Sequence, residues 1–303
     1  MSFFSKQSSA DTYGAILDIG SGSVLAAIVH SNVNNPHPIV VWSHREHVPL
    51  RSIESLEQVS KSVITALMNV VMELDSAGRK VLTQYNSGAR IKQIQSSISA
   101  PWSYTVTKSI NYTQEKPFMV TQTLIDELIK TTEAQIASDL KANTTLDEMG
   151  LSTITTATVE MLANGYRVNK PTGSKATELS VSRANVVAQK SITQALDKTA
   201  DKIYAHNKHK RISFMLMAHS AIRDLLPHTF EMGIVDVTYE ATELGIVRDG
   251  ALQYCTHTPF GSFSLARELA EVLKIPLSEA FGYLHTVEPL AFLDNATTAQ
   301  KTD

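Results

Sequence analysis

Two segments far apart in this chain repeat one layout, and this repeat constrains the fold more than any other feature. Residues 18–23 read DIGSGS and residues 236–242 read DVTYEAT. Each segment begins with an aspartate at the end of an apolar run and leads into a second apolar run. The pairs Ile28-Val29 and Ile246-Val247 stand at the same distance from their aspartates. Self-similarity of this kind indicates one structural unit used twice, so we expect two related strand-turn-strand units.

The first of these turns has the composition of a phosphate-binding loop. Glycines at positions 20 and 22 allow a sharp turn with close approach of the backbone. The loop amides and the hydroxyls of Ser21 and Ser23 can donate hydrogen bonds to phosphate oxygens. Asp18 can hold Mg²⁺ through water, because this ion keeps much of its hydration shell. The same pattern is also typical of an ordinary hairpin turn, so the rest of the chain has to decide between the two.

The apolar pattern of the first half changes between strand and helix spacing. Residues 13–48 read as strands, and spacings of three and four then predict a long helix from Ile53 to a stop at Gly78. A strand is expected at residues 91–101, followed by a helix around residues 124–129. From about residue 147 to 204 the chain reads as an extended segment, a loop, a further strand and a helix. We interpret this region as a small α+β insertion.

The second half contains the later copy of the repeat. Ile212 to Met217 reads as a buried strand, with a short helix after Ser220. The basic run before it, residues 208–211, is interpreted as a solvated turn. The later strand-turn-strand unit spans residues 234–254, and its Asp249-Gly250 pair predicts a two-residue hairpin turn. Helices are expected at residues 265–273 and, after a break at Pro276, at residues 280–284.

These patterns divide the chain into five parts. We expect a flexible N-terminus at residues 1–12 and a first subdomain, with the start of the insertion, at residues 13–145. The inserted subdomain is expected at residues 146–205, and an incomplete second subdomain at residues 206–290. Residues 291–303 form a polar tail.

Composition excludes several classes of protein. A net charge of −3 gives no basic surface for binding nucleic acid. A single cysteine excludes a disulfide framework within the chain and favours a reducing compartment. The sequence has neither a signal-peptide pattern nor an apolar run of membrane-spanning length. A cytoplasmic protein is therefore expected.

The order of these elements resembles the superfamily of actin, heat-shock chaperones and sugar kinases. Within it the chain is similar to the branch of the cell-division protein FtsA and the type IV pilus assembly protein PilM. Four stretches carry the likeness: the N-terminus with Phe3 and Phe4, the loop at 18–24, residues 164–181, and residues 235–261. The resemblance implies an α/β, actin-like (ribonuclease H-like) fold. It also implies a small inserted α+β subdomain of the SHS2 type.

In this superfamily the two loops face each other across a cleft that binds ATP and Mg²⁺. The resemblance implies that Asp18 and Asp236 hold the Mg²⁺ ion, and that Asp236 is the catalytic residue if the protein is active. It implies nucleotide contacts from Asp18, Gly20, Ser21, Gly22, Ser23, Thr242 and Gly261.

The second loop departs from this pattern. Glycines wrap the phosphates in nucleotide-binding relatives, whereas here the corresponding positions read Thr238, Tyr239 and Glu240. Their side chains occupy space that phosphates need, and Glu240 would repel phosphate if it faced the site. The chain also ends about twenty residues after the helix that follows the second loop, where the family continues into a further subdomain and an adenosine loop. ATP and Mg²⁺ binding is therefore expected to be weak or absent.

The resemblance implies a scaffold that acts in cell division or type IV pilus assembly. Its expected partners are proteins, either a division filament or an inner-membrane pilus protein, with self-association through the inserted subdomain. It would then reach the inner face of the membrane only through partners. The alternative is an active ATPase or small-metabolite kinase of the same superfamily. The N-terminus and the lack of an amphipathic anchor in the tail favour PilM over FtsA, but the pathway stays open.

Overall fold

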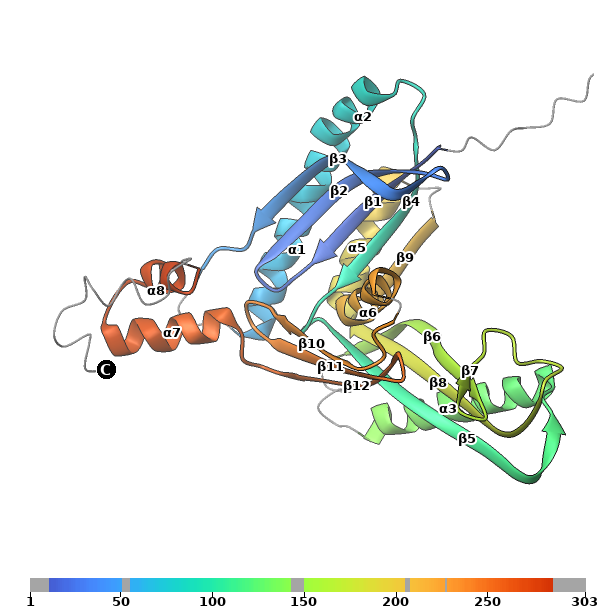
Figure 1. The fold of residues 1–303 in the computed structure, drawn as a ribbon. Coiled ribbons are helices and arrows are strands. Elements are labelled where there is room, and N and C mark those ends of the chain that lie inside the picture. Colours follow the sequence, from blue (N-terminus) through green and yellow to red (C-terminus); the bar gives the residue numbers. More distant parts are fainter. Residues whose placement is uncertain (1–10, 51–54, 143–149, 205–207, 227, 286–303) are drawn as a thin grey trace, which may run out of the picture.

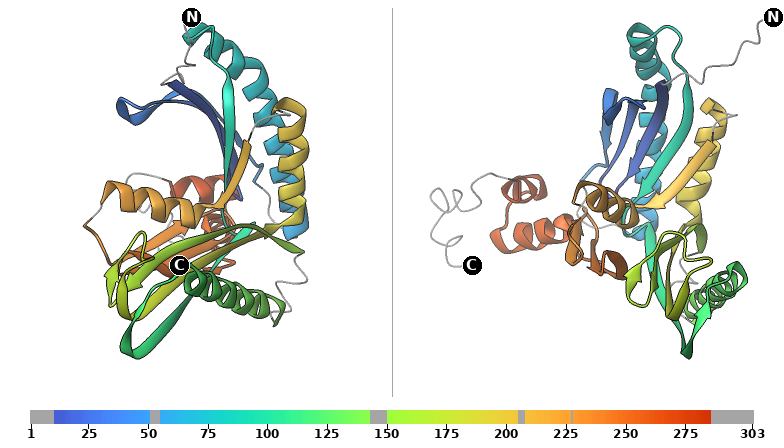
Figure 2. Two further views of the ribbon diagram at one scale, coloured as in Figure 1. Left: turned by 90° about the vertical axis from the view of Figure 1, so that its right-hand side faces the viewer. Right: turned by 45° about the vertical axis from the view of Figure 1, so that its right-hand side comes forward.

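The computed structural model describes residues 11–50, 55–142, 150–204, 208–226 and 228–285. It contains three β-sheets, which we call sheets A, B and C, with helices against them (Figure 1). Sheet A and its helices form one end of the molecule, and sheet B with one long helix forms the other (Figure 2). Sheet C lies between these ends, and two helices project from its side.

Sheet A has the strand order β3-β2-β1-β4-β9 and is the α/β part of the fold. Strand β1 pairs antiparallel with β2 and parallel with β4, and β4 pairs parallel with β9. Leu17 and Ile19 of β1 are buried on one face of the sheet, as the near-continuous apolar run predicts. The bounds are β1 Asp11–Ile19, β2 Ser23–Asn32, β3 Asn35–His47, β4 Ile91–Ile98 and β9 Lys208–Ser213.

Two long helical segments cover that face. Helix α1 (Leu56–Glu73) begins at a Ser55 capping box and runs through a π-helical turn, η1 (Leu74–Gly78), into α2 (Arg79–Tyr85). The expected stop at Gly78 is therefore wrong. A β-carbon there would lie 3.1 Å from Trp42 and 3.2 Å from Ile28. The glycine lets the helix approach the sheet closely instead of ending it.

The second covering helix, α5 (Lys190–Tyr204), packs on sheet A as well. Its residues Ile192 and Leu196 are fully buried in one core with Val63 and Leu67 of α1. The sequence placed this helix in the insertion at residues 146–205. The structure instead puts it on sheet A, because its apolar stripe completes the cover over that sheet.

Sheet B has the order β5-β8-β6-β7 and all of its pairs are antiparallel. Helix α3 (Gln122–Ala142) packs on it, and Ile125 and Leu128 share a core with Leu179 and Val181. Strand β5 and helix α3 lie before residue 146, in the segment 13–145 that was expected to contain the start of the insertion. The bounds are β5 Ser103–Met119, β6 Leu151–Ala163, β7 Tyr166–Arg167 and β8 Lys175–Gln189.

The region after residue 208 differs from the prediction. The expected strand at Ile212–Met217 is wrong, since helix α6 (Phe214–Leu225) begins there with Ser213 as its N-cap. The Ser213 hydroxyl accepts the Leu216 amide at 3.2 Å. The basic run 208–211 lies in strand β9 beside β4 and not in a turn. The capping serine ends the strand and starts the helix.

Sheet C is the three-stranded antiparallel sheet β10-β11-β12. Its β11-β12 turn has positive φ at Asp249 (52°) and Gly250 (75°), which confirms the predicted two-residue hairpin. Ile234, Val247 and Leu252 share a core with Met215 of α6 and Val186 of sheet B. The bounds are β10 Met232–Val237, β11 Thr242–Arg248, β12 Ala251–Thr258, α7 Ser262–Leu273 and α8 Leu277–Tyr283.

The termini of the expected domains are described only in part. Strand β1 begins at Asp11, so the end of the expected flexible segment 1–12 is a strand. Residues 1–10, which carry the family-like N-terminus, and the polar tail 291–303 lie outside the described residues. None of the helices within the described ranges combines the length and apolar composition needed to cross a membrane.

Candidate functional site

The two copies of the repeat have the same strand register. Asp18 of β1 lies opposite Leu25 of β2, and Asp236 of β10 lies opposite Glu243 of β11, so the partner in both hairpins stands seven residues after the aspartate. The two turns therefore present equivalent positions.

These two turns contact each other directly. The hydroxyl of Ser21 donates to Thr238 Oγ1 at 3.1 Å and accepts the backbone N–H of Glu240 at 3.0 Å. Ser21 is only 1% exposed. A buried hydroxyl that is bonded in this way has its donor and one acceptor site used within the protein.

The ring of Tyr239 lies on Gly22. A β-carbon at position 22 would come within 1.4 Å of Tyr239 Cδ2, so no other residue fits there without moving the ring. The ring also packs against Phe263 of α7, with centroids 4.2 Å apart, and against Phe281 of α8 at 5.2 Å. The space beside the first glycine-rich turn is thus filled by an aromatic cluster.

The N-terminus of α7 is closed by the second loop. The amides of Ser262 and Phe263 donate to the carbonyl oxygens of Thr238 (3.0 Å) and Tyr239 (2.8 Å). A β-carbon on Gly261 would lie 2.5 Å from those oxygens, so the glycine permits the contact. The free amides of a helix N-terminus form a ready anion site. Here these amides bind the protein's own loop.

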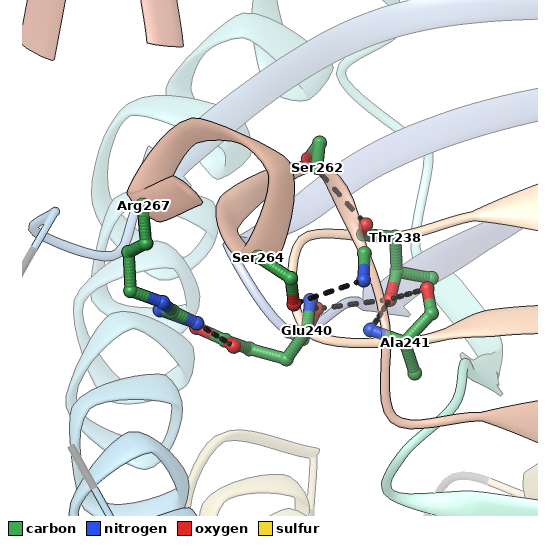
Figure 3. Close-up of polar contacts among 8 residues, drawn as sticks. Thr238, Glu240, Ala241, Ser262, Ser264 and Arg267 are labelled. Carbon is green, nitrogen blue, oxygen red and sulfur yellow. Dashed lines mark hydrogen bonds and ion pairs between the residues drawn. The ribbon is translucent and has the colours of Figure 1, made fainter. Parts of the chain in front are cut away.

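The carboxylate of Glu240 forms an ion pair with Arg267 of α7 (Figure 3). The two oxygens of the carboxylate accept from Arg267 Nη1 at 3.3 Å and Nη2 at 2.5 Å. A two-point pair of this kind fixes geometry as well as charge. Glu240 therefore holds α7 against the second loop.

Several further polar groups of the two loops have partners within the protein. The Gly20 amide donates to Ser23 O at 3.0 Å, and Gly20 O accepts from Trp102 Nε1 at 3.1 Å. Ser23 Oγ accepts from Arg45 at 2.6 Å. On the other side, Thr242 Oγ1 donates to Phe260 O at 2.7 Å. These groups therefore bond within the protein in this arrangement.

Carboxyl groups gather behind the loops. Asp18 accepts from Ser97 Oγ at 2.6 Å. Burial, together with the charge of Asp18, raises the pKa of Asp236. Glu243 is 2% exposed, and its burial and the neighbouring Asp236 raise its pKa to about 8. Sequence reasoning missed Glu243, although a glutamate within the apolar strand of the second copy was a usable signal.

Asp18 and Asp236 do not belong to a larger cluster of metal-ligating side chains in the described part of the chain. No three His, Cys, Asp or Glu side chains there are arranged to hold an ion. Asp236 Oδ2 and Glu243 Oε2 are buried without a hydrogen-bond partner. The structure thus brings the expected Mg²⁺ residues Asp18 and Asp236 close enough to interact, but without a third ligand.

Tyr104, Cys255 and His257 lie around Glu243, and burial shifts the pKa of each toward its neutral form. Burial, followed by the charge of Glu243, raises the pKa of Tyr104 and brings that of Cys255 to about 12. Burial lowers the pKa of His257, which stands opposite Glu243 in the β11-β12 register. Burial behind the loops thus favours the uncharged forms of these three side chains.

No protein-family model matches the chain, and no curated protein matches it. Among solved structures it is similar to a chain of the PilM-PilN type IV pilus biogenesis complex, at 12% identity and a TM-score of 0.53. This match covers 89% of the present chain and 68% of that chain.

Two further solved structures are similar to the chain at TM-scores below 0.5. EutJ, an ethanolamine utilization protein from Carboxydothermus hydrogenoformans, matches at 9% identity and 0.42, covering 93% of this chain and 65% of that one. A Bacteroides thetaiotaomicron protein of unknown function with an actin-like ATPase fold matches at 11% identity and 0.44, covering 90% and 80%. The repeated hairpins and the α/β sheet with its two covering helices are an actin-like fold.

Proposed function

We propose that this chain is an actin-like scaffold of type IV pilus assembly that acts through protein contacts and has a degenerate nucleotide site. The proposal rests on the contact between the two loops, residues 18–23 and 236–242. Tyr239 covers Gly22, and Ser21 bonds to Thr238 and Glu240. A nucleotide's phosphates would need the same space and the same donors.

The partners are proposed from the likeness to the PilM-PilN complex. The chain would bind an inner-membrane pilus protein on the cytoplasmic side and reach the membrane only through it. Self-association would use the unit formed by sheet B and α3, which we propose as the SHS2-like insert. A role in cell division would use the same scaffold with a division filament as its partner.

Titration with Mg-ATP tests the nucleotide part of this proposal. We expect calorimetry to give no heat of binding for the wild-type protein. Micromolar affinity that disappears in Asp18→Ala, but persists in the matched surface variant Asp224→Ala, would show a working nucleotide site. Sedimentation over a range of concentrations tests self-association, for which a growing assembly is expected.

The second candidate is an ATPase or small-metabolite kinase. It is favoured by one observation, the gathering of Asp18, Asp236 and Glu243 behind the loops. A carboxylate near the phosphates is what such an enzyme needs to position its nucleophile. A phosphate-release assay distinguishes the enzyme from the scaffold. ATP turnover above background that is lost in Asp236→Asn would establish the enzyme. The scaffold proposal predicts background rates for the wild-type protein and for Asp236→Asn.

A further inference from the structure

The two copies of the hairpin differ in what covers them. Leu17 and Ile19 of β1 correspond by register to Val235 and Val237 of β10. The first pair is 3% and 0% exposed, whereas the second is 62% and 57% exposed. One unit of the repeat is thus buried where its equivalent lies open.

The open positions belong to one apolar face of sheet C. Val235 lies opposite Leu244, and Ile246 lies opposite Tyr254, so all four side chains share that face. Leu244 and Ile246 are half-buried, and Tyr254 is 56% exposed. The β2 residues equivalent to Leu244 and Ile246 are Ala26 and Ile28, and both are fully buried in the core beneath α1. A contiguous exposed apolar patch of this kind marks an interaction surface.

The edge of the sheet is open as well. Strand β1 pairs on its outer side with β4, in parallel. Within the described residues, β10 pairs only with β11. An unpaired edge strand offers alternate amides and carbonyls to an incoming strand.

The helix that follows sheet C in the chain does not cover this face. Helix α7 comes directly after β12, as α1 comes after β3. It projects from the side of the sheet and packs with α8 (Figure 1). The Glu240-Arg267 pair and the contact of Phe263 with Tyr239 hold it in that direction.

A second copy of the chain would pair with the open edge of sheet C but would leave its apolar face uncovered. A two-fold axis pairs identical edge strands antiparallel and places the same apolar faces side by side, still uncovered. A segment that supplies both a strand and an amphipathic helix fills the edge and the face together, as β4 and α1 do in the first unit. The occupant that matches the whole surface is therefore a strand-helix segment of another polypeptide.

We propose that sheet C binds a partner protein which adds a strand parallel to β10 and lays an apolar helix face over Val235, Leu244, Ile246 and Tyr254. The inference rests on the proposed scaffold function only in naming a protein as the occupant. It is independent of the loop contact and of nucleotide, so the Mg-ATP titration and the experiment below can fail separately.

A photo-crosslinking amino acid placed at Val235 in cells that make the protein tests this. The matched control position is Val40 of β3, which is also a valine on an edge strand and also 62% exposed. We expect one heterologous partner to crosslink from position 235 and not from position 40. Crosslinks to a second copy, to α7 or to residues 286–303, or no crosslink at all, would overturn the proposal.

Reconstitution with the identified partner completes the test. Val235→Asp should weaken binding at least about tenfold, because a charge replaces an apolar contact, while Val40→Asp should leave it unchanged. Partner binding should slow hydrogen exchange of the β10 amides that point away from β11. Equal affinity for wild type and Val235→Asp, or β10 amides that exchange slowly in the isolated protein, would overturn the inference. Thermal melts confirm that both variants are folded.

Discussion

Tyr239 lies across Gly22 so closely that a β-carbon at position 22 would reach 1.4 Å from the ring. The two residues come from the equivalent turns of the repeated hairpins, which the rest of the chain separates. Their contact converts what the glycine pattern predicts as a phosphate loop into a packing surface. It also makes Gly22 a sensitive probe of whether the loops are closed in solution.

Gly22→Ala should destabilise the protein by about 1 to 3 kcal/mol, because the added methyl group displaces a packed ring. Denaturant unfolding measures this. In a Tyr239→Ala background the same substitution should cost much less, since the ring is gone. Gly233→Ala is the control, because a β-carbon there meets no atom within 4 Å. Equal effects in both backgrounds would mean that the two loops are apart in solution.

The Glu240-Arg267 pair should contribute measurably to holding α7. Its side chains are 16% and 29% exposed, so solvent screens the interaction less than at the surface. A double-mutant cycle with Glu240→Gln and Arg267→Met is expected to give a coupling of about 1 kcal/mol. The exposed Glu57-Lys61 pair on α1, at 77% and 71%, should give no measurable coupling. A zero value for the first cycle would contradict the role assigned to Glu240.

Local signals in the sequence predicted much of the fold correctly. The Asp249-Gly250 pair adopts the two positive φ angles that its turn type requires. The aspartate-centred repeat reappears in the strand register, since Asp18 and Asp236 have equivalent partners. Such features depend on residues a few positions apart, which a single sequence contains.

The predictions from the sequence were wrong where tertiary contacts determine the structure. The apolar stripe of α5 indicates that one face of this helix is buried, but only the assembled core shows that this face packs with α1. The apolar run around Met215 fits a strand or a helix, and the Ser213 cap settles it as a helix. Likewise, Tyr239 and Glu240 predicted a crowded second loop, but not that Tyr239 would pack on Gly22 and Glu240 on Arg267.

Gly78→Ala should destabilise the protein even though alanine favours a helix by about 1 kcal/mol. The new methyl group would meet Trp42 and Ile28 at 3.1 and 3.2 Å, and Ile28 is fully buried and cannot move aside. Gly282→Ala in α8 is the matched control, because its β-carbon meets open space. It should stabilise, as measured by thermal unfolding. A stabilising Gly78→Ala would show that α1 and α2 stand farther from the sheet.

Glu243 should make stability fall as pH rises. Its folded pKa of about 8 lies above the ordinary glutamate value of 4.5, so between these values the unfolded chain loses a proton that the folded protein keeps. The free energy of unfolding then decreases by at most about 1.4 kcal/mol per pH unit and levels off above the folded pKa. Asp236, His257, Tyr104 and Cys255 surround the group. Glu243→Gln removes the titration, so its stability relative to wild type should grow across this window, whereas exposed Glu271→Gln should show no such trend. A constant difference between Glu243→Gln and wild type from acid to alkaline pH would mean that Glu243 is ionised in the folded protein.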